Sequence, residues 1–430
     1  MSFFKQFGEL LMMGARAHAK WELDTSRTIL SDKRRMAILG LLTIPIIIGG
    51  FAFAEDIKGA LPSLIGGKEA YNPAFYSPVI FVISILIGVG AGLITGCIGA
   101  GGGFIIAPAL MSAGVKGILA VGTDLFHIFA KAIMGSVIHR KLGNVSVPLA
   151  VVFLIGSIVG ATTGGYINRV LYELNPVLSD AFITTVYSVM LGFLGLYAMT
   201  DFLKARKIGK VADMHGHGGP KRDEGVDLGG LPKKLQAVKI PPMVRFDHDL
   251  APGGRGISWV FLVLSGAIVG LAAGIMGVGG GFITFPIFVY VLGVSSMTTV
   301  GTDILQIVFT AGYAAVSQYA IYGFIFYTLA MGMLLGSLVG IQVGAMVTKV
   351  VPGITIRGFY AMAVLAGFVN RIFALPGKLG GMEIIPISKE TGVLLDNIGI
   401  WAFFIVIAGF SIWVIGTFFK NIGAMKGEEV

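Results

Sequence analysis

The stretch Gly99-Ala100-Gly101-Gly102-Gly103-Phe104-Ile105 returns later in the chain as Gly277-Val278-Gly279-Gly280-Gly281-Phe282-Ile283. A proline follows each copy at the same offset, at Pro108 and Pro286. Two further blocks recur in the same order and at nearly constant spacing: Gly-Thr-Asp at 122–124 and 301–303, and Gly-Ser-x-Val-Gly at 156–160 and 336–340. Four blocks in one order predict an internal repeat.

The composition excludes several classes of protein. The chain has 430 residues, 55% hydrophobic and 13% charged, with a mean hydropathy of +0.86. A soluble domain carries roughly 25% charged residues, so a soluble globular enzyme and a disordered chain are both excluded. The 64 glycines follow no G-X-Y period, and the long apolar runs do not alternate as in a β-barrel. We therefore predict an all-α polytopic membrane protein with closely packed helices.

A helix needs about 20 apolar residues to cross a bilayer, and ten stretches meet this length. They are 36–54, 77–98, 119–139, 148–170, 181–203, 257–276, 297–321, 325–348, 356–376 and 397–419. Two shorter apolar pieces, 103–114 and 281–293, each follow a glycine cluster directly. Each would cover roughly 18–20 Å of a ~30 Å core. Short glycine-led segments of this kind indicate broken helices at a transporter binding site, whether or not they span fully.

These segments predict two repeats of about five helical segments each, with one extra helix at each end. From the N-terminus, the expected parts are a cytoplasmic amphipathic segment (1–35), an extra transmembrane helix (36–54), the first repeat (77–203), a basic cytoplasmic linker (204–256), the second repeat (257–376) and an extra C-terminal helix (397–419).

The charged loops predict that the two repeats are inserted in opposite directions. The loop after the third helix of the first repeat carries Arg140 and Lys141, whereas the matching loop 319–324 has no charge. The next loop reverses this pattern, because 171–180 lacks Lys and Arg while the matching stretch carries Lys349 and Arg357. By the positive-inside rule, both termini are then cytoplasmic in a bacterial-type inner membrane. The net charge of +9 reflects this topology and not a nucleic-acid partner.

The glycine clusters are the first candidate binding elements. Glycine lets backbone N–H groups approach a ligand closely, and each cluster opens a short helix whose positive end favours an anion. The alternative is that these glycines only allow close helix packing. The candidate residues here are Gly99, Gly101, Gly102, Gly103, Gly277, Gly279, Gly280 and Gly281.

The third helix of the first repeat carries Asp124, His127 and Lys131, whose spacing puts them on one helix face. A charged side chain deep in the bilayer costs roughly 2.5–3.5 kcal/mol, so such residues face protein or water. His127 and Lys131 are candidates for attracting an anion, and an aspartate for a coupling proton or cation. The alternatives are helix capping by the aspartates, snorkelling by Lys131 and a core role for His127. The candidates of both repeats are Thr123, Asp124, His127, Lys131, Thr302, Asp303 and Gln306.

The chain holds one cysteine, Cys97, and no metalloprotease or nucleophile-elbow motif. We therefore expect no cofactor, no metal site and no enzymatic activity. A passive anion channel would use the same residues and differs from a transporter in lacking uphill flux. A non-transporting scaffold or sensor is a further alternative, although duplicated intramembrane polar residues argue against it.

Two copies of Gly-x-Gly-Gly-Gly-Phe followed by Pro and then Gly-Thr resemble the sulfite exporter TauE/SafE family, also called the 4-toluenesulfonate uptake permeases. The resemblance covers about residues 77–376. It implies a secondary transporter of small sulfur-containing anions, such as sulfite or organosulfonates. The substrate, the direction of transport, the coupling ion and the oligomeric state, including a homodimer, stay open.

Overall fold

The computed structural model describes residue 37 and residues 78–98, 103–141, 145–208, 230–247, 254–279, 283–284, 287–347, 350–351 and 353–421. The expected 1–35 segment, the 36–54 helix apart from Ala37, and much of the 204–256 linker lie outside the described residues. So do Gly99, Gly101, Gly102, Gly280 and Gly281.

The described residues are mostly helical. The first half comprises α5 (Pro78–Ile98), α6 (Gly103–Ser112), α7 (Gly117–Lys141), α8 (Val147–Leu174) and α9 (Pro176–Ile208). The second half comprises α11 (Trp259–Met276), the π-helical η2 (Ile287–Leu292), α13 (Ser296–Ala314), the π-helical η3 (Ala315–Ala320), α14 (Tyr327–Val347) and α15 (Gly353–Gly381), followed by α16 (Lys389–Lys420). Between the halves lie α10 (Gly230–Ala237) and an antiparallel hairpin of β1 (Met243–Phe246) and β2 (Arg255–Ser258).

Seven helices of the described chain are long and apolar enough to cross a membrane: α5, α8, α9, α11, α14, α15 and α16. This confirms an all-α polytopic membrane protein. The helices α7 and α13, which carry the polar candidate residues, are not among the seven. The short α6 is apolar and is buried from Gly103 to Leu110, so the first glycine-led segment is a short helix inside the protein.

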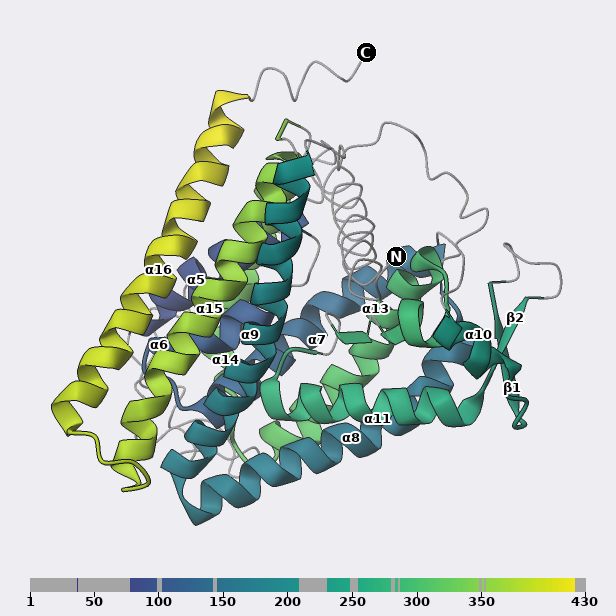
Figure 1. Cartoon of the computed structure of the whole chain (residues 1–430), viewed down its shortest axis with the longest axis horizontal. Helices are drawn as coiled ribbons and strands as arrows, with labels where there is room; N and C mark the ends of the chain where they lie inside the picture. Colours follow the sequence, from purple (N-terminus) through teal and green to yellow (C-terminus); the bar gives the residue numbers. More distant parts are fainter. Residues whose placement is uncertain are drawn as a thin grey trace.

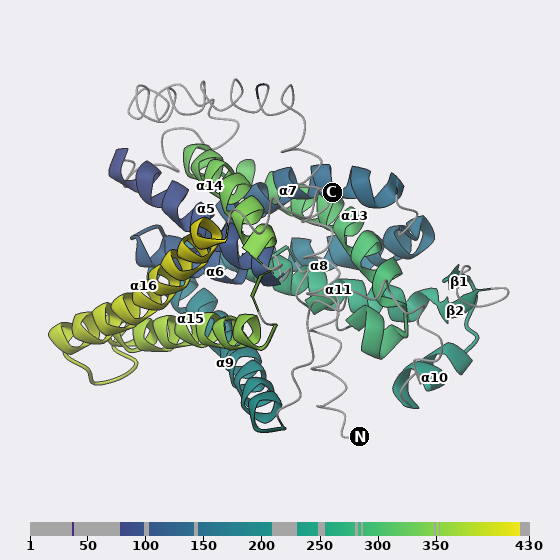
Figure 2. The ribbon, with the colours of Figure 1, turned by 90° about the horizontal axis from the view of Figure 1, so that it is seen from above.

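Helices from the two halves pack in pairs. α5 lies against α14, α8 against α11, α7 against α13 and α9 against α15. Figure 1 shows α8 and α11 side by side, crossing the group formed by α9, α15 and α16 at a wide angle. Figure 2 shows α15 beside α16 from above, with α9 next to α15. Each of these four pairs takes one helix from each half.

Contacts at glycines give the directions within these pairs. A side-chain carbon on Gly88 would meet Met333, and one on Gly92 would meet Ser337, so α5 and α14 run in the same direction. The α8–α11 pair follows the same rule. In the α9–α15 pair the order reverses, because Gly192 faces Phe368 and Gly195 faces Leu365, which lies earlier in the chain. On α7, Gly122 faces Tyr319 of η3 and Phe129 faces Gly312 of α13, so α7 runs antiparallel to the continuous α13–η3 segment.

The two parallel pairs have backbones in direct contact. A Cβ on Gly156 of α8 would lie 1.8 Å from the Val263 carbonyl oxygen of α11. A Cβ on Gly336 of α14 would lie 2.1 Å from the Ile85 carbonyl oxygen of α5. Small residues permit this approach, which is how membrane helices gain packing energy when lipid is as apolar as their side chains.

Two threonines join the halves through matching hydrogen bonds. The backbone N–H of Phe326, just before α14, donates to Thr123 Oγ1 at 3.0 Å. The backbone N–H of Ser146, just before α8, donates to Thr302 Oγ1 at 3.0 Å. The first N–H groups of a helix have no partner within it, so each threonine satisfies one such group on the opposite half.

The glycine contacts predict that Gly156→Ala destabilises the protein by about 1–3 kcal/mol, because the added methyl group overlaps the α11 backbone. The measurement is the thermal midpoint of the purified protein in detergent. Gly409→Ala is the matched control, since a Cβ at Gly409 on α16 meets no atom within 4 Å. Equal midpoints for both variants would contradict the close α8–α11 contact.

The threonine bonds predict that Thr123→Val lowers stability by about 1–3 kcal/mol, because the substitution keeps the shape but leaves a buried N–H unpaired. Thr123→Ser retains the hydroxyl and should stay near the wild-type midpoint. The same midpoint measurement tests both. If the valine and serine variants behave alike, the hydroxyl does not hold the start of α14.

Candidate functional site

The polar candidates of both repeats lie on the paired helices α7 and α13. Asp124 lies seven residues after Gly117, the start of α7, and Asp303 lies seven residues after Ser296, the start of α13. Both aspartates are therefore inside their helices, and neither caps the helix start. The cap of α13 is Ser295, whose side chain accepts a hydrogen bond from the Thr298 amide. The capping interpretation of the two aspartates is wrong.

In the first half, Asp124 and His127 form a buried pair. Asp124 has no exposed surface and His127 is 2% exposed. His127 Nδ1 lies 3.6 Å from Asp124 Oδ1, and His127 Nε2 lies 3.0 Å from Ser337 Oγ on α14. Neither carboxylate oxygen of Asp124 has a hydrogen-bond partner among the described residues. Lys131 follows on the same helix and is half-buried. This half thus contains a buried carboxylate that no donor among the described residues reaches.

In the second half, the matching positions form a closed chain of hydrogen bonds. Gln306 Nε2 donates to Asp303 Oδ1 at 2.8 Å, and Thr310 Oγ1 donates to Gln306 Oε1 at 2.8 Å. Thr310 Oγ1 also lies 2.8 Å from Ser157 Oγ on α8. Ser157 corresponds to Ser337 in the repeated Gly-Ser-x-Val-Gly block. Neutral partners therefore hold Asp303, whereas Asp124 has a histidine beside it.

The described parts of the two glycine loops meet against α7, the helix that carries Asp124 and His127. A Cβ on Gly103 would lie 3.3 Å from Val278 Cα, so the start of α6 contacts the loop after α11. Gly277 and Gly279 have φ angles of 78° and 66°, which glycine adopts without strain. A Cβ on Gly277 would lie 2.7 Å from the Val121 carbonyl oxygen of α7. Close packing thus requires these glycines, and it places both loops against the helix that carries Asp124.

Three residues absent from the sequence-based candidates hold the end of α11. Asn168 Nδ2 donates to the carbonyl oxygens of Gly274 and Ile275 at 3.2 and 3.0 Å. The Tyr319 hydroxyl donates to the Gly274 carbonyl and the Tyr187 hydroxyl to the Met276 carbonyl. The last carbonyls of a helix lack partners within it. These side chains therefore fix the helix end that leads into the second glycine loop, and their spacing in the sequence gave no signal of this.

Arg371 is a further buried cation that sequence reasoning did not select. It lies inside α15 and is 2% exposed. Its Nε donates to Asn370 Oδ1 at 2.7 Å and its Nη2 to Ser112 Oγ, at the end of α6, at 2.8 Å. An arginine inside an apolar stretch was the available signal, because such residues face the protein interior.

Metal chemistry has no obvious ligand set among the described residues, which contain no group of three or more His, Cys, Asp or Glu side chains able to hold an ion. Cys97 is buried, and its thiol lies 3.4 Å from the Gly344 carbonyl oxygen at the α5–α14 contact. It is part of the packed interior of the protein.

The chain is similar to a known family of membrane transporters and to individual proteins named as probable membrane transporters. The family model of the sulfite exporter TauE/SafE matches residues 84–370, more than half of the chain. The probable membrane transporter protein YjnA of Bacillus subtilis strain 168 is 24% identical over 268 residues, which cover 61% of this chain and 87% of the relative.

Two other relatives carry similar names. The probable membrane transporter protein YunE of the same strain is 25% identical over 280 residues, covering 63% of this chain and 89% of the relative. A probable membrane transporter protein of Xylella fastidiosa strain 9a5c is 22% identical over 271 residues, covering 61% and 84%. No solved structure gives a significant match. The resemblance inferred from the glycine loops is thus confirmed, and this integral membrane chain belongs to the sulfite exporter TauE/SafE family of transporters.

Proposed function

We propose that this chain is a secondary transporter of small sulfur-containing anions, such as sulfite or an organosulfonate. The observation that carries the proposal is the buried Asp124–His127 pair, with Lys131 beside it, at the contact between helices from the two halves. A membrane protein bears the cost of buried charge where a solute or ion passes. The substrate class follows from the family description.

Two inverted repeats are part of the proposal. The antiparallel α7–α13 and α9–α15 pairs support it, because equivalent helices point in opposite directions only when the repeats are inverted. The α5–α14 and α8–α11 pairs support it as well, because each pairs the first helix of one half with the fourth segment of the other. Alternating access then consists of one half rocking against the other around the α7–α13 contact, with both chain termini in the cytoplasm.

The anion is held on the first half in this proposal. Lys131 supplies positive charge, His127 supplies a ring N–H, and the described ends of the glycine loops, where Gly103 meets Val278, supply backbone N–H groups. Asp124 carries the coupling proton, because a carboxylate with no hydrogen-bond donor among the described residues is most easily buried in its neutral form. The charged and titratable groups around it are His127 and Lys131 on α7 and Tyr187 on α9.

The function is tested by uptake of labelled sulfite into proteoliposomes, with and without an imposed pH gradient. Unlabelled sulfate, thiosulfate and small sulfonates serve as competitors. Saturable accumulation driven by the gradient supports a coupled transporter. Flux that only equilibrates sulfite across the membrane indicates a passive channel, and the absence of flux from folded protein removes sulfite as a substrate.

Replacing Lys131 tests the anion site. Lys131→Ala should reduce sulfite uptake at least tenfold, because a lost charge-assisted contact costs on the order of 1.5–3 kcal/mol. Lys131→Arg keeps the charge and should retain part of the activity. Lys389→Ala, at an exposed lysine at the start of α16, is the control. Full uptake by a correctly folded Lys131→Ala protein would remove this residue from the site.

Replacing the two aspartates tests the coupling assignment. Asp124→Asn should abolish gradient-driven uptake while sulfite exchange at equal pH continues, because the amide cannot carry a proton. Asp303→Asn should leave coupling intact and change mainly the thermal midpoint, since Asp303 is bonded to Gln306. Both activities are measured in the same proteoliposomes. Loss of coupling in Asp303→Asn alone would assign the proton to the second half.

A further inference from the structure

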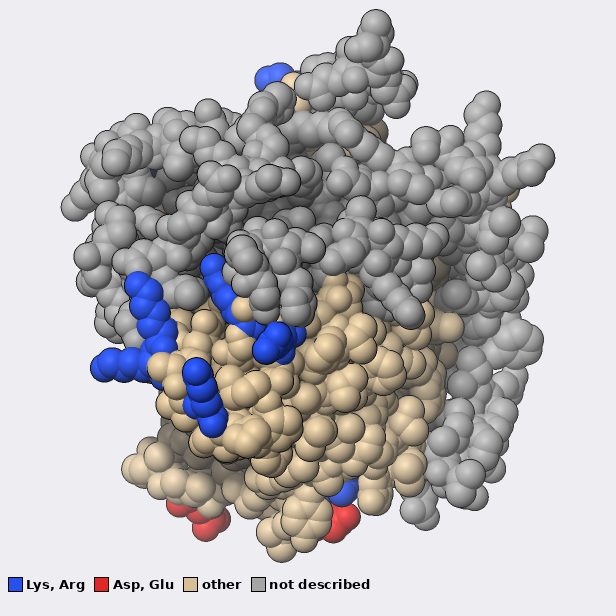
Figure 3. Space-filling view, turned by 90° about the vertical axis from the view of Figure 1, so that its right-hand side faces the viewer, with Lys and Arg blue, Asp and Glu red and all other residues tan. Residues whose placement is uncertain are grey.

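The segment between the two halves forms a folded platform with an unequal distribution of charge. We use platform for the described residues 230–247 and 254–258, which comprise α10 and the β1–β2 hairpin. They carry five basic residues and one acid. Lys233, Lys234, Lys239 and Arg245 are exposed, whereas the acid, Asp247, is 6% exposed. Figure 3 shows Lys and Arg side chains gathered on the described surface at this end of the molecule.

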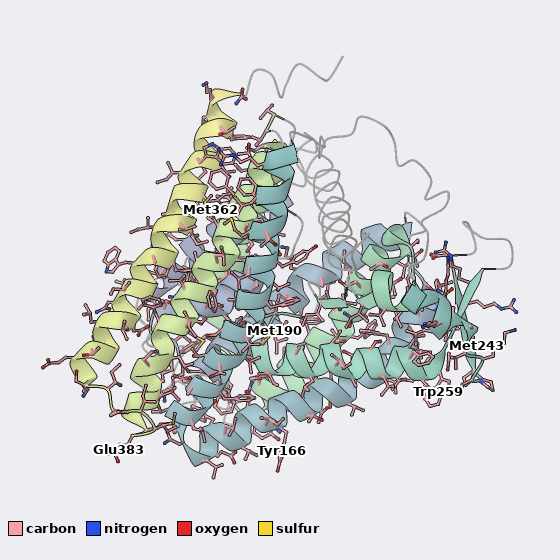
Figure 4. The ribbon with its side chains drawn as sticks, in the orientation of Figure 1. Tyr166, Met190, Met243, Trp259, Met362 and Glu383 are labelled. Atoms are coloured by element: carbon pink, nitrogen blue, oxygen red, sulfur yellow. The ribbon has the colours of Figure 1, made fainter. Side chains whose placement is uncertain are left out.

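Exposed apolar side chains accompany the basic ones. Val238 and Ile240 are 38% and 44% exposed and flank Lys239. Trp259, the first residue of the membrane-spanning α11, donates its indole N–H to the Pro241 carbonyl oxygen at 3.1 Å. Figure 4 places Trp259 at the outer end of α11, near Met243 of the hairpin. Basic residues beside apolar side chains and a tryptophan at a helix end are typical of the membrane–water interface.

The platform is fixed to the start of α13, the helix that carries Asp303. The carboxylate of Asp247 accepts hydrogen bonds from the Ser295 amide at 2.9 Å, the Ser295 hydroxyl at 2.7 Å and the Thr298 hydroxyl at 2.6 Å. Arg255 lies 3.7 Å from the same carboxylate. Gln236 of α10 donates to the Leu292 carbonyl oxygen at 2.8 Å. The platform is therefore hydrogen-bonded directly to the first turn of α13.

We propose that the platform binds the headgroups of anionic phospholipids at the membrane surface and thereby anchors the start of α13. The charge complementarity carries the choice of partner, because the exposed cations match a lipid phosphate while the acid is buried and paired. Clusters of Lys and Arg directly beside a spanning helix attract anionic lipid. This inference rests on the chain spanning a membrane and holds for any transported substrate.

The test compares three forms of the full-length protein by native mass spectrometry after mixing with phosphatidylglycerol or phosphatidylcholine. The variant K234Q/K239Q/R245Q removes three exposed charges, and K234R/K239R/R245K keeps them. The wild type and the charge-keeping variant should bind phosphatidylglycerol in preference to phosphatidylcholine. The glutamine variant should bind phosphatidylglycerol at least about tenfold more weakly than the wild type. Its binding of phosphatidylcholine should be unchanged.

A second readout excludes an indirect effect of folding. All three forms should share one thermal midpoint in detergent, and only in the wild type and the charge-keeping variant should added phosphatidylglycerol raise it. Equal phosphatidylglycerol binding by the glutamine variant would overturn the proposal. So would a glutamine variant that keeps its lipids but changes from an oligomer to a monomer, because the platform would then be an interface between copies of the chain.

Discussion

The contact of helix backbones across the two halves is the constraint on which the other features depend. Apolar side chains gain little by leaving lipid for protein, so helices in a membrane associate through close packing. Gly156 and Gly336 bring α8 onto α11 and α14 onto α5 at distances that any Cβ would prevent. Once these pairs are formed, α7 and α13 lie in contact, and their polar residues are removed from lipid. The glycine content is thus the condition for a buried polar site.

Within this scaffold, equivalent positions of the two halves have different chemistry. Asp124 and Asp303 occupy the same place in their helices. The equivalent serines contact other residues of these helices, because Ser337 lies 3.0 Å from His127 and Ser157 lies 2.8 Å from Thr310. Gln306 donates a hydrogen bond to Asp303, whereas Asp124 has His127 beside it and receives no hydrogen bond from the part of the chain that the structure describes. A satisfied polar network makes a rigid element, while an unsatisfied one is costly unless a ligand or proton completes it. This difference between the halves is the reason for assigning the proposed binding site to the first half.

Much of this arrangement could be predicted from the sequence because it repeats. The duplicated glycine loops, the short segment over 103–114 and the shared face of Asp124 and His127 all depend on local spacing. The hydrogen-bond partner of Arg371 could not be predicted, because Ser112 belongs to a distant helix end. The bonds of Asn168 to the end of α11 join residues more than a hundred positions apart. The composition of residues 204–256 predicts a polar linker. Part of it is folded because its residues form hydrogen bonds with the start of α13 and with η2, which lie far along the chain.

The difference between the halves also bears on how alternating access could be driven. If the repeats were identical as well as inverted, a two-fold rotation about an axis in the membrane plane would interconvert the inward-open and outward-open states, which would then be equal in free energy. The second half has Gln306 and Thr310 at the positions that correspond to His127 and Lys131. This difference in sequence removes that equality. A ligand shifts an equilibrium only by its differential affinity for the two states. In the proposed function the anion and the proton both bind on the first half, so both would favour the same one of the two states, as coupled movement requires.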